Sequence, residues 1–177
     1  MIYIATPLPR GKTYKEAARL LLREVLLRRG VSEAEIACGE NGKPYLKNRP
    51  DIYFNLSGCP EGVLCAVGPA PVGVDVEAVR QVSGRLVRRA CNEREYAEIK
   101  SSRDPARAFI RLWTAKESSL KLSGKGITGN IAQTLKTAVD LEKIDYLFYD
   151  GGSFIACRAV YRRDAEIYGK IKFMEIT

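Results

Sequence analysis

The sequence contains no histidine, and this one absence excludes several kinds of catalysis. Ser-His-Asp and Cys-His nucleophiles, zinc sites of the His-Glu-x-x-His type and histidine proton shuttles all need an imidazole ring. Any catalysis must therefore come from carboxylates, from lysines or from a metal ion held by oxygen atoms.

Cysteine motifs and long apolar runs are also lacking. The five cysteines are odd in number and scattered, without a Cys-x-x-Cys pair, which predicts reduced and mostly buried thiols. No stretch approaches the roughly 18–20 apolar residues that a membrane span needs. The start of the chain, MIYIATPLPR, holds too short an apolar run for a signal peptide. We therefore expect a cytoplasmic protein with no membrane partner.

The chain does carry an excess of positive charge, with 29 Lys and Arg against 21 Asp and Glu and a net charge of +8. Such an excess predicts an anionic partner, which could be a nucleic acid, a phosphorylated small molecule or an acidic protein. Composition does not choose among these three. Nucleic-acid binding is supported by charge alone, because no recognisable binding motif is present, and we do not expect it.

The hydrophobic patterns predict an α+β fold in which a helix followed by antiparallel strands occurs twice. The first series contains a strand, a helix, a turn at Asn41-Gly42 and three strands, over residues 1–5, 14–29, 51–57, 62–68 and 72–77. The second series contains two short helices, a long helix, a hairpin and a last strand, over residues 85–91, 92–100, 104–124, 144–161 and 168–176. Asn92 with Glu95 and Asp104 with Pro105 predict the starts of two of these helices, and Gly124 predicts the end of the long one. Residues 127–143 are ambiguous. We predict two tightly packed lobes, residues 1–78 and 79–177.

The stretch VGVDVE, at residues 72–77, places two carboxylates on one face of a strand. Successive side chains alternate in direction, so Asp75 and Glu77 point the same way, about 6–7 Å apart. At this separation they repel each other unless a positive group lies between them. A solvated strand face is the alternative interpretation of this stretch taken alone.

A third carboxylate lies within the apolar face of the long helix. This face consists of Phe109, Ile110, Leu112, Trp113 and Leu120. Glu117 lies among them, where a carboxylate is costly unless it is paired, hydrogen-bonded or bound to a metal. A surface ion pair with Lys121 is the plainer alternative. With Asp75 and Glu77, however, Glu117 completes a set of oxygen ligands suited to Mg²⁺, and Lys116 and Lys121 would face phosphates. This combination indicates metal-assisted phosphoryl-type transfer.

VGVDVE at 72–77 and WTAKESSLK at 113–121 together resemble the two main motifs of the 4′-phosphopantetheinyl transferases, of the two-lobed surfactin-synthetase-activating (Sfp-like) type. That family carries a (V/I)G(V/I)D(V/I)E strand followed, at a similar separation, by a WxxKExxxK helix. Secondary matches are GKPYL, FNLS and CNEREY, and the resemblance covers roughly residues 15–126. It implies a pseudo-dimer of two similar lobes, each a small antiparallel sheet packed on a long helix.

The resemblance also implies an activity. Coenzyme A would bind between the lobes, with its adenine and 3′-phosphate on the N-terminal lobe and the catalytic helix in the C-terminal lobe. The 4′-phosphopantetheine arm would pass, with Mg²⁺ or alternatively Mn²⁺, to a serine of an apo acyl or peptidyl carrier protein. Adenosine 3′,5′-bisphosphate would be released. Acidic carrier proteins, which serve fatty acid, polyketide and nonribosomal peptide biosynthesis, would then explain the positive charge of a monomeric enzyme.

By motif position, the resemblance assigns a role to individual residues. Asp75, Glu77 and Glu117 would be the metal ligands. Glu117 would also be the base for the incoming serine, directly or through water, and Lys121 would stabilise the leaving phosphate. The coenzyme would be bound by Lys116 at a phosphate, Lys43 and Pro44 at the adenine and 3′-phosphate end, Ser57 near a phosphate and Arg19 at the same end.

One departure from the family concerns coenzyme recognition. Family members continue NLS with a histidine that contacts the 3′-phosphate, whereas this chain has Gly58 at that position. Nearby arginines such as Arg10 or Arg49 are candidate replacements. The alternative function is that of a non-catalytic relative which binds a carrier protein or a nucleotide. Retention of all the carboxylates and lysines of the two main motifs argues against it.

Overall fold

The structure, a computed structural model, describes residues 1–124 and 143–176. Its elements in chain order are β1 (Ile2–Ala5), α1 (Tyr14–Leu27), β2 (Ile36–Cys38), β3 (Pro44–Leu46), β4 (Tyr53–Cys59), β5 (Gly62–Gly68), β6 (Gly73–Ala78), α2 (Gly84–Ala90), α3 (Glu93–Ser101), α4 (Pro105–Ser123), β7 (Ile144–Asp150), β8 (Phe154–Tyr161), a 3₁₀ turn (Arg162–Asp164), α6 (Ala165–Tyr168) and β9 (Ile171–Phe173). The predicted α+β class is confirmed. Within these two described ranges, no helix is both long and apolar enough to cross a membrane.

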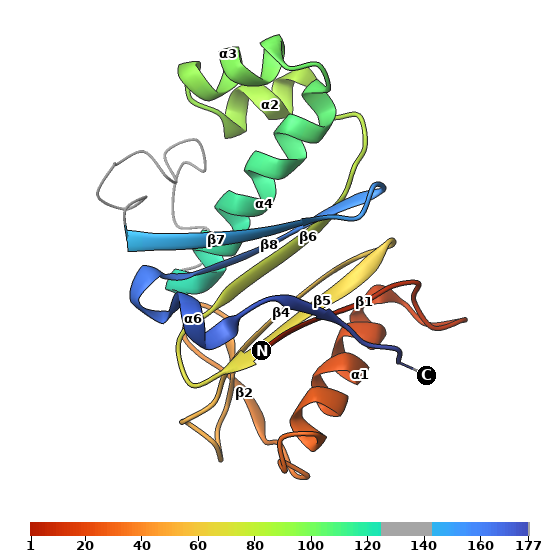
Figure 1. Ribbon diagram of the computed structural model, residues 1–177, viewed down its shortest axis with the longest axis vertical. Coiled ribbons are helices and arrows are strands. Elements are labelled where there is room, and N and C mark those ends of the chain that lie inside the picture. Colours follow the sequence, from red (N-terminus) through yellow and green to blue (C-terminus); the bar gives the residue numbers. More distant parts are fainter. Residues whose placement is uncertain (125–142, 177) are drawn as a thin grey trace.

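The strands form two larger sheets and a separate hairpin (Figure 1). One sheet has the strand order β4-β5-β1-β9, the other has the order β6-β8-β7, and β2 pairs with β3 alone. All neighbouring strands are antiparallel except β1 and β9, which are parallel. Figure 1 shows α4 running along the three-stranded sheet and α1 beside the four-stranded one, with α2 and α3 at the far end of α4.

Strand alternation sorts the core into layers. Tyr3 on β1 packs with α1, whereas its neighbours Ile2 and Ile4 pack with Val74 and Val76 of β6. The inner faces of the two sheets therefore bury each other, and α1 and α4 cover the outer faces. Because the valines of β6 face inward, its alternate residues must face α4, and this order places the carboxylates of VGVDVE beneath that helix.

The helix boundaries follow the predicted signals. Asn92 and Glu95 form a reciprocal capping box at the start of α3. Asp104 caps α4 and is followed by Pro105 in its first turn, while Gly124 ends the helix with a left-handed φ of 68°. The short helix α6 is not predicted by the sequence patterns. The ambiguous residues 127–143 lie, except for the last, outside the described residues.

The last strand, β9, joins the sheet formed by the N-terminal strands and not the sheet that contains β7 and β8. β9, predicted within residues 168–176, pairs with β1 at the edge of the four-stranded sheet. A boundary at residue 78 therefore does not separate the two sheets completely. The division into lobes 1–78 and 79–177, and a symmetry relating them, stay predictions.

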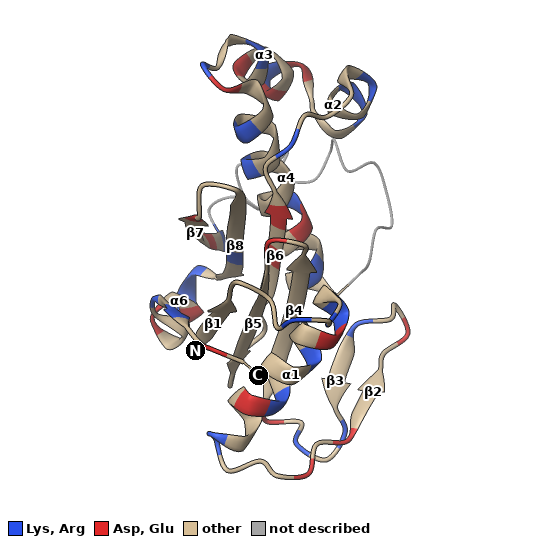
Figure 2. Cartoon of the chain, turned by 90° about the vertical axis from the view of Figure 1, so that its right-hand side faces the viewer, with Lys and Arg blue, Asp and Glu red and all other residues tan. Residues whose placement is uncertain are grey.

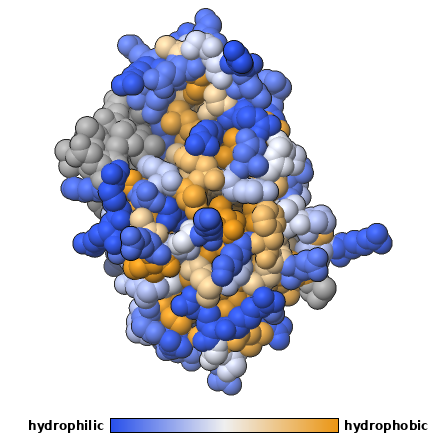
Figure 3. All heavy atoms as spheres, viewed as in Figure 1, coloured by the Kyte–Doolittle hydropathy of each residue, from blue (hydrophilic) through white to orange (hydrophobic). Residues whose placement is uncertain are grey.

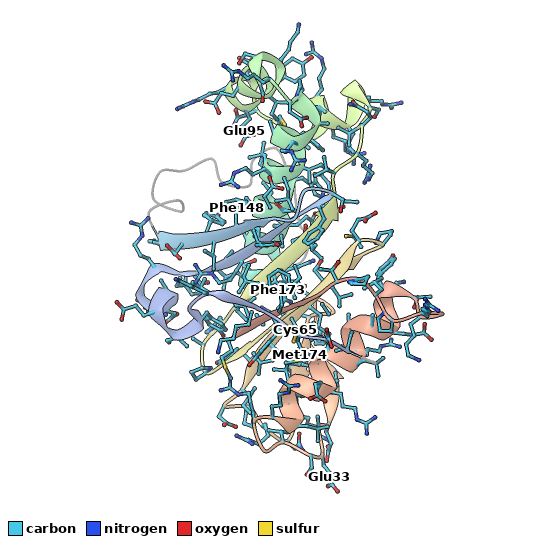
Figure 4. The ribbon with its side chains drawn as sticks, turned by 45° about the vertical axis from the view of Figure 1, so that its right-hand side comes forward. Glu33, Cys65, Glu95, Phe148, Phe173 and Met174 are labelled. Carbon is cyan, nitrogen blue, oxygen red and sulfur yellow. The ribbon has the colours of Figure 1, made fainter. Side chains whose placement is uncertain are left out.

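All five cysteines are free. Four are buried and Cys38 is exposed, as the sequence predicts for reduced thiols. Cys65, labelled in Figure 4, lies in the core between the four-stranded sheet and α1.

The two sheets meet along a seam, where the edge strands β4 and β6 lie side by side. Side chains of β4 supply the hydrogen-bond acceptors that β6 lacks on this edge. Asn55 Oδ1 accepts a hydrogen bond from the backbone N–H of Val74 at 2.8 Å, and Ser57 Oγ accepts one from that of Val76 at 3.3 Å. An edge strand exposes unpaired backbone groups, and these two contacts satisfy them across the seam.

Candidate active site

The glycine of VGVDVE allows β6 and α4 to approach each other closely. A Cβ atom at Gly73 would lie 1.9 Å from the carbonyl oxygen of Ser118 and 2.4 Å from the backbone nitrogen of Leu122. No side chain fits in that space. The absence of a side chain thus sets how near the carboxylates of β6 come to the last turns of α4.

Three side chains from three elements meet at this point, and we call them the Ser57–Asp75–Lys121 cluster. Asp75 on β6 is only 3% exposed. Its Oδ1 accepts a hydrogen bond from Ser57 Oγ on β4 at 2.9 Å and pairs with Lys121 Nζ on α4 at 2.7 Å. Lys121 Nζ also donates to Ser57 Oγ at 3.0 Å. The other carboxylate oxygen, Asp75 Oδ2, is buried and has no hydrogen-bond partner.

Glu77 and Glu117 flank this cluster, and both are half-buried. Burial, followed by the charge of Asp75, raises the pKa of each carboxyl above its ordinary value of 4.5. Lys121 opposes both shifts, and a hydrogen bond from Trp113 further lowers the pKa of Glu77. Figure 2 shows acidic residues of β6 and α4 close to each other, with basic residues nearby. Among the described residues, Lys121 and, at Glu77, Arg80 therefore offset only part of the burial and repulsion that these carboxyls experience.

A cavity of about 300 Å³ opens beside the cluster. Its walls come from the β2–β3 turn, from β4 and from α4, and its lining residues are Asn41, Gly42, Lys43, Pro44, Asn55, Leu56, Glu117, Leu120, Lys121 and Gly124. A neighbouring cavity of about 430 Å³ shares Lys43 and Pro44 with the first. The structure thus brings Lys43, Pro44, Glu117 and Lys121 to one cavity, although the first two are more than 70 positions from the last two in the sequence.

Lys43 also ties the β2–β3 turn to α4. Its ammonium donates to the carbonyl oxygens of Lys121 and Leu122 at the end of the helix and, at 3.4 Å, to that of Val72 before β6. A cation at a helix C-terminus satisfies carbonyl groups that have no partner within the helix. Partial burial of Lys43 lowers the pKa of its ammonium. In this arrangement Lys43 holds the rim of the cavity as well as lining it.

Lys116 lies apart from the other candidate residues. It is fully buried, and its Nζ pairs with Glu95 Oε2 at 2.7 Å and donates to the carbonyl oxygen of Ala90 at 2.8 Å. Glu95 belongs to α3, in the helical end of the molecule where Figure 4 labels it. The structure therefore points Lys116 at α2 and α3, not toward the cavity where a coenzyme phosphate was expected.

The residues expected at the far end of the coenzyme are more dispersed. Arg19 is exposed on α1 and lines neither cavity. Arg49, a candidate replacement for the missing histidine, already forms a two-point ion pair with Asp51. A Cβ atom at Gly58 would lie 3.2 Å from the ring of Tyr14. Tyr14 therefore borders the space that a side chain at position 58 would enter.

The three candidate metal ligands, Asp75, Glu77 and Glu117, are not arranged around a common point in this structure. Within residues 1–124 and 143–176, no three His, Cys, Asp or Glu side chains are grouped so that they could hold a metal ion. The donor chemistry nevertheless fits a hard cation, because all three candidates are carboxylates and Asp75 Oδ2 is buried without a partner. Burial and the charge of Asp75, which raise the pKa of Glu77 and Glu117, would both be offset by a bound cation.

Sequence reasoning missed the structural roles of Gly73 and Asn55. Gly73 sets the distance between β6 and α4, and Asn55 joins β4 to β6. Both lie inside stretches that the sequence analysis singled out, VGVDVE and FNLS. A glycine inside a strand signals a close backbone approach and could have identified the first role, whereas no sequence signal shows which backbone group an asparagine will meet.

Comparisons with known proteins agree on one family. A sequence profile of the 4′-phosphopantetheinyl transferase superfamily matches residues 71–160, just over half of the chain. 4′-Phosphopantetheinyl transferase Sfp of Bacillus subtilis (strain 168) is 32% identical over 124 residues, which cover 64% of this chain and 55% of that protein. 4′-Phosphopantetheinyl transferase gsp of Aneurinibacillus migulanus is 34% identical over 123 residues, or 64% and 51% of the two chains. 4′-Phosphopantetheinyl transferase psf-1 of Bacillus pumilus is 36% identical over 125 residues, or 64% and 53%.

The aligned part of this chain spans about half the length of these relatives. The matched profile includes both main motifs, and the structure brings those motifs together at the Ser57–Asp75–Lys121 cluster and the adjoining cavity. The chain belongs to the 4′-phosphopantetheinyl transferase superfamily.

Proposed function

We propose that the protein transfers the 4′-phosphopantetheine arm of coenzyme A to a serine of an apo acyl or peptidyl carrier protein, with release of adenosine 3′,5′-bisphosphate. One observation carries this proposal: Glu117 and Lys121 of one motif line a single cavity with Lys43 and Pro44 of another, and Lys121 contacts Asp75 of a third. Membership of the family supports the reaction class.

In this proposal Asp75, Glu77 and Glu117 hold a Mg²⁺ ion, with Mn²⁺ as an alternative. When bound, the cation would supply Lewis-acid polarisation of the diphosphate of coenzyme A and would neutralise part of its charge. Asp75 is the first ligand, because Oδ2 is buried without a partner while Ser57 fixes the orientation of the carboxylate through Oδ1. Glu77 and Glu117 would rotate toward it.

Glu117 suits the role of general base. A base works best when its pKa lies near the working pH, and burial together with the charge of Asp75 shifts the pKa of Glu117 upward, in that direction. Its place on the wall of the cavity would let it take the proton of the carrier serine, directly or through water. Lys121, on the same wall, would then stabilise the charge that develops on the leaving phosphate.

The cavity beside the β2–β3 turn would receive the coenzyme. Lys43 and Pro44 border both hollows there, and Ser57 is joined to the first by its hydrogen bond from Lys121, which lines it. A nucleotide with three phosphate groups suits a site in a chain with a net charge of +8. Arg19 is the least supported member of this set, because it lines neither hollow.

Intact-mass spectrometry of a carrier protein tests the proposal. The protein is incubated with coenzyme A, Mg²⁺ and several apo carrier proteins, and we expect one phosphopantetheine arm to be added to the carrier serine. Changing that serine to alanine should abolish the mass increase. No increase with any carrier, with or without a chelator, would refute the proposal.

The Glu117→Gln variant tests the role of the proposed base. We expect it to lower the transfer rate by at least about a hundredfold, in the range that general bases contribute, while the fold is retained. Glu98→Gln is the matched control, because Glu98 is also a helical glutamate with a basic partner, Arg94, but is 64% exposed. A transfer rate in Glu117→Gln close to that of Glu98→Gln would show that Glu117 is neither the general base nor a required metal ligand.

A further inference from the structure

The contact between Lys121 and Asp75 has a consequence for cation binding. Lys121 Nζ lies 2.7 Å from Asp75 Oδ1 and 3.0 Å from Ser57 Oγ, so the ammonium occupies the polar side of the most buried carboxylate in the site. The ammonium of Lys121 is in direct contact with the negative charge of Asp75. A divalent cation that binds the unpartnered Oδ2 of Asp75 would share this carboxylate with the ammonium of Lys121, and one that binds Oδ1 would have to displace it.

Electrostatics favours displacement. Two positive charges that meet one carboxylate at contact distance repel each other strongly in a partly buried site, where the effective dielectric constant is well below that of water. The site also keeps two further carboxylates, Glu77 and Glu117, near Asp75. Their charge would attract a divalent ion more strongly than a single ammonium, which favours the exchange.

The structure also shows where the displaced lysine would go. Lys121 lies in the last turn of α4 and its side chain is 29% exposed, so part of it reaches solvent. It already lines the cavity that it shares with Lys43 and Glu117. A change of rotamer moves the ammonium from the carboxylate into this cavity without any movement of the helix.

We propose that Lys121 is the internal counter-ion of Asp75 in the metal-free protein, and that binding of the divalent cation releases it into the cavity as a phosphate-binding group. This inference rests on the proposed function, since it concerns the same cation site. The inference couples binding of the cation at Asp75 to release of Lys121 toward the leaving phosphate. Lys121 stays paired with Asp75 until the cation binds, so the protein without metal has no unpaired buried charge at Asp75.

Metal affinity tests this inference without any activity measurement. Binding of Mn²⁺ to the coenzyme-free protein is measured by isothermal titration calorimetry and by the electron paramagnetic resonance signal of free Mn²⁺. If Lys121 competes with the cation, Lys121→Met and Lys121→Gln should bind Mn²⁺ more tightly than the wild type, on the order of tenfold. Lys121→Arg, which keeps the charge, should not gain affinity.

Lys100→Met is the matched control. Lys100 is an exposed lysine in the last turn of α3, as Lys121 is in the last turn of α4, so the substitution removes the same charge from the same position of a helix. Its Mn²⁺ affinity should stay within about twofold of the wild type, in line with the screening of distant exposed charges. Trp113, the only tryptophan of the chain, donates a hydrogen bond to Glu77. A change in its fluorescence on addition of Mn²⁺ would therefore report independently that the ion binds at this site.

The outcomes separate this inference from the proposed function. Equal or weaker Mn²⁺ binding by both Lys121→Met and Lys121→Gln, with folding checked by circular dichroism, overturns the inference, and so does an absence of binding in every variant. The transfer assay on the wild type decides the proposed function separately. A wild type that modifies the carrier, combined with no gain in affinity, leaves the function standing and removes the counter-ion role.

Discussion

At the scale of single residues, the carboxylates of the site are held in a way that works against the stability of the folded protein. Burial and mutual repulsion raise the pKa of Glu77 and of Glu117, which means that their charged forms are less favourable in the folded chain than in the unfolded one. Lys121 neutralises only part of this charge. Such destabilised groups are typical of functional sites.

The first residue-scale prediction concerns stability. Replacing either carboxylate by glutamine, in Glu77→Gln or Glu117→Gln, should raise the free energy of unfolding at pH 8 without metal, by on the order of 0.5–2 kcal/mol. The reason is that the neutral amide carries no charge that burial would penalise, and that it no longer repels Asp75. Urea denaturation followed by circular dichroism measures the gain, and unchanged or lower stability in both variants would contradict the prediction.

The second residue-scale prediction concerns pH. A carboxyl with a raised pKa holds its proton longer in the folded state, so its contribution to stability is fully present below the ordinary value of 4.5 and is lost as the pH rises through the higher folded value. The advantage of Glu117→Gln over the wild type should therefore shrink as the pH falls toward 4.5. Thermal melting across this range, with Glu98→Gln as control, measures it. An advantage independent of pH would show that charge is not its cause.

At the scale of secondary-structure elements, Lys116 and Gly73 fix α4 from two sides. Lys116 ties the middle of the helix to the end of α2 and to α3 through Ala90 and Glu95. Gly73 lets β6 press against the last turns of the helix. The position of Glu117 relative to Asp75 depends on both contacts, although neither residue lines the cavity that contains Glu117.

We predict that Lys116 acts mainly on stability. Lys116→Ala should lower the free energy of unfolding by about 3–5 kcal/mol, because it leaves Glu95 partly buried without its partner. Arg94→Ala, which breaks an exposed ion pair from the same helix α3, should cost less than about 1 kcal/mol. Denaturant unfolding compares them. Unchanged stability with a large rise in the KM for coenzyme A would instead support the phosphate contact that the sequence motif suggests.

Gly73→Ala should displace α4, and with it Glu117 and Lys121, although Gly73 does not line the cavity. The added methyl group meets backbone atoms of α4, which cannot rotate away, so we expect a loss of about 3 kcal/mol in stability and a displaced helix. Transfer should fall even at a temperature where the variant is folded. Gly84→Ala is the control, because a Cβ atom there meets nothing within 4 Å. Equal stability of the two variants would refute the close-approach argument.

How much of this could be predicted from the sequence depends on the range of the interactions. The α+β class, the capping box of Asn92 and the end of α4 at Gly124 rest on local signals, and these predictions are confirmed. That Asp75 and Glu77 share a face follows from strand alternation. The burial of Lys116 could not be predicted, because its direction depends on how α2 and α3 pack against α4, and no local pattern encodes that packing.

At the scale of the whole molecule, the net charge of +8 is the property most relevant to a protein partner. On the face shown in Figure 3, hydrophilic residues cover the two ends and an apolar band lies between them. Long-range attraction between a basic protein and an acidic one speeds their encounter and is screened by salt over about 10 Å at 0.1 M.

The whole-molecule prediction is a salt effect confined to the encounter. With an acidic apo carrier protein, the KM for the carrier should rise several-fold between about 50 and 300 mM NaCl, while kcat changes little. Steady-state kinetics at saturating coenzyme A measures both constants. A KM that does not respond to salt would show that the positive charge of the protein does not steer this partner.

The pairing of β9 with β1 has a consequence for the order in which the molecule is made. β1 is synthesised before every other strand that the structure describes, yet its neighbour on one side comes from Ile171–Phe173. On the ribosome, the four-stranded sheet must therefore wait, with one edge open, until nearly every residue described here has emerged. An open edge of this kind invites pairing with other chains. For this protein, the interval between the synthesis of its first strand and the arrival of β9 is when association with the wrong partner is most to be expected.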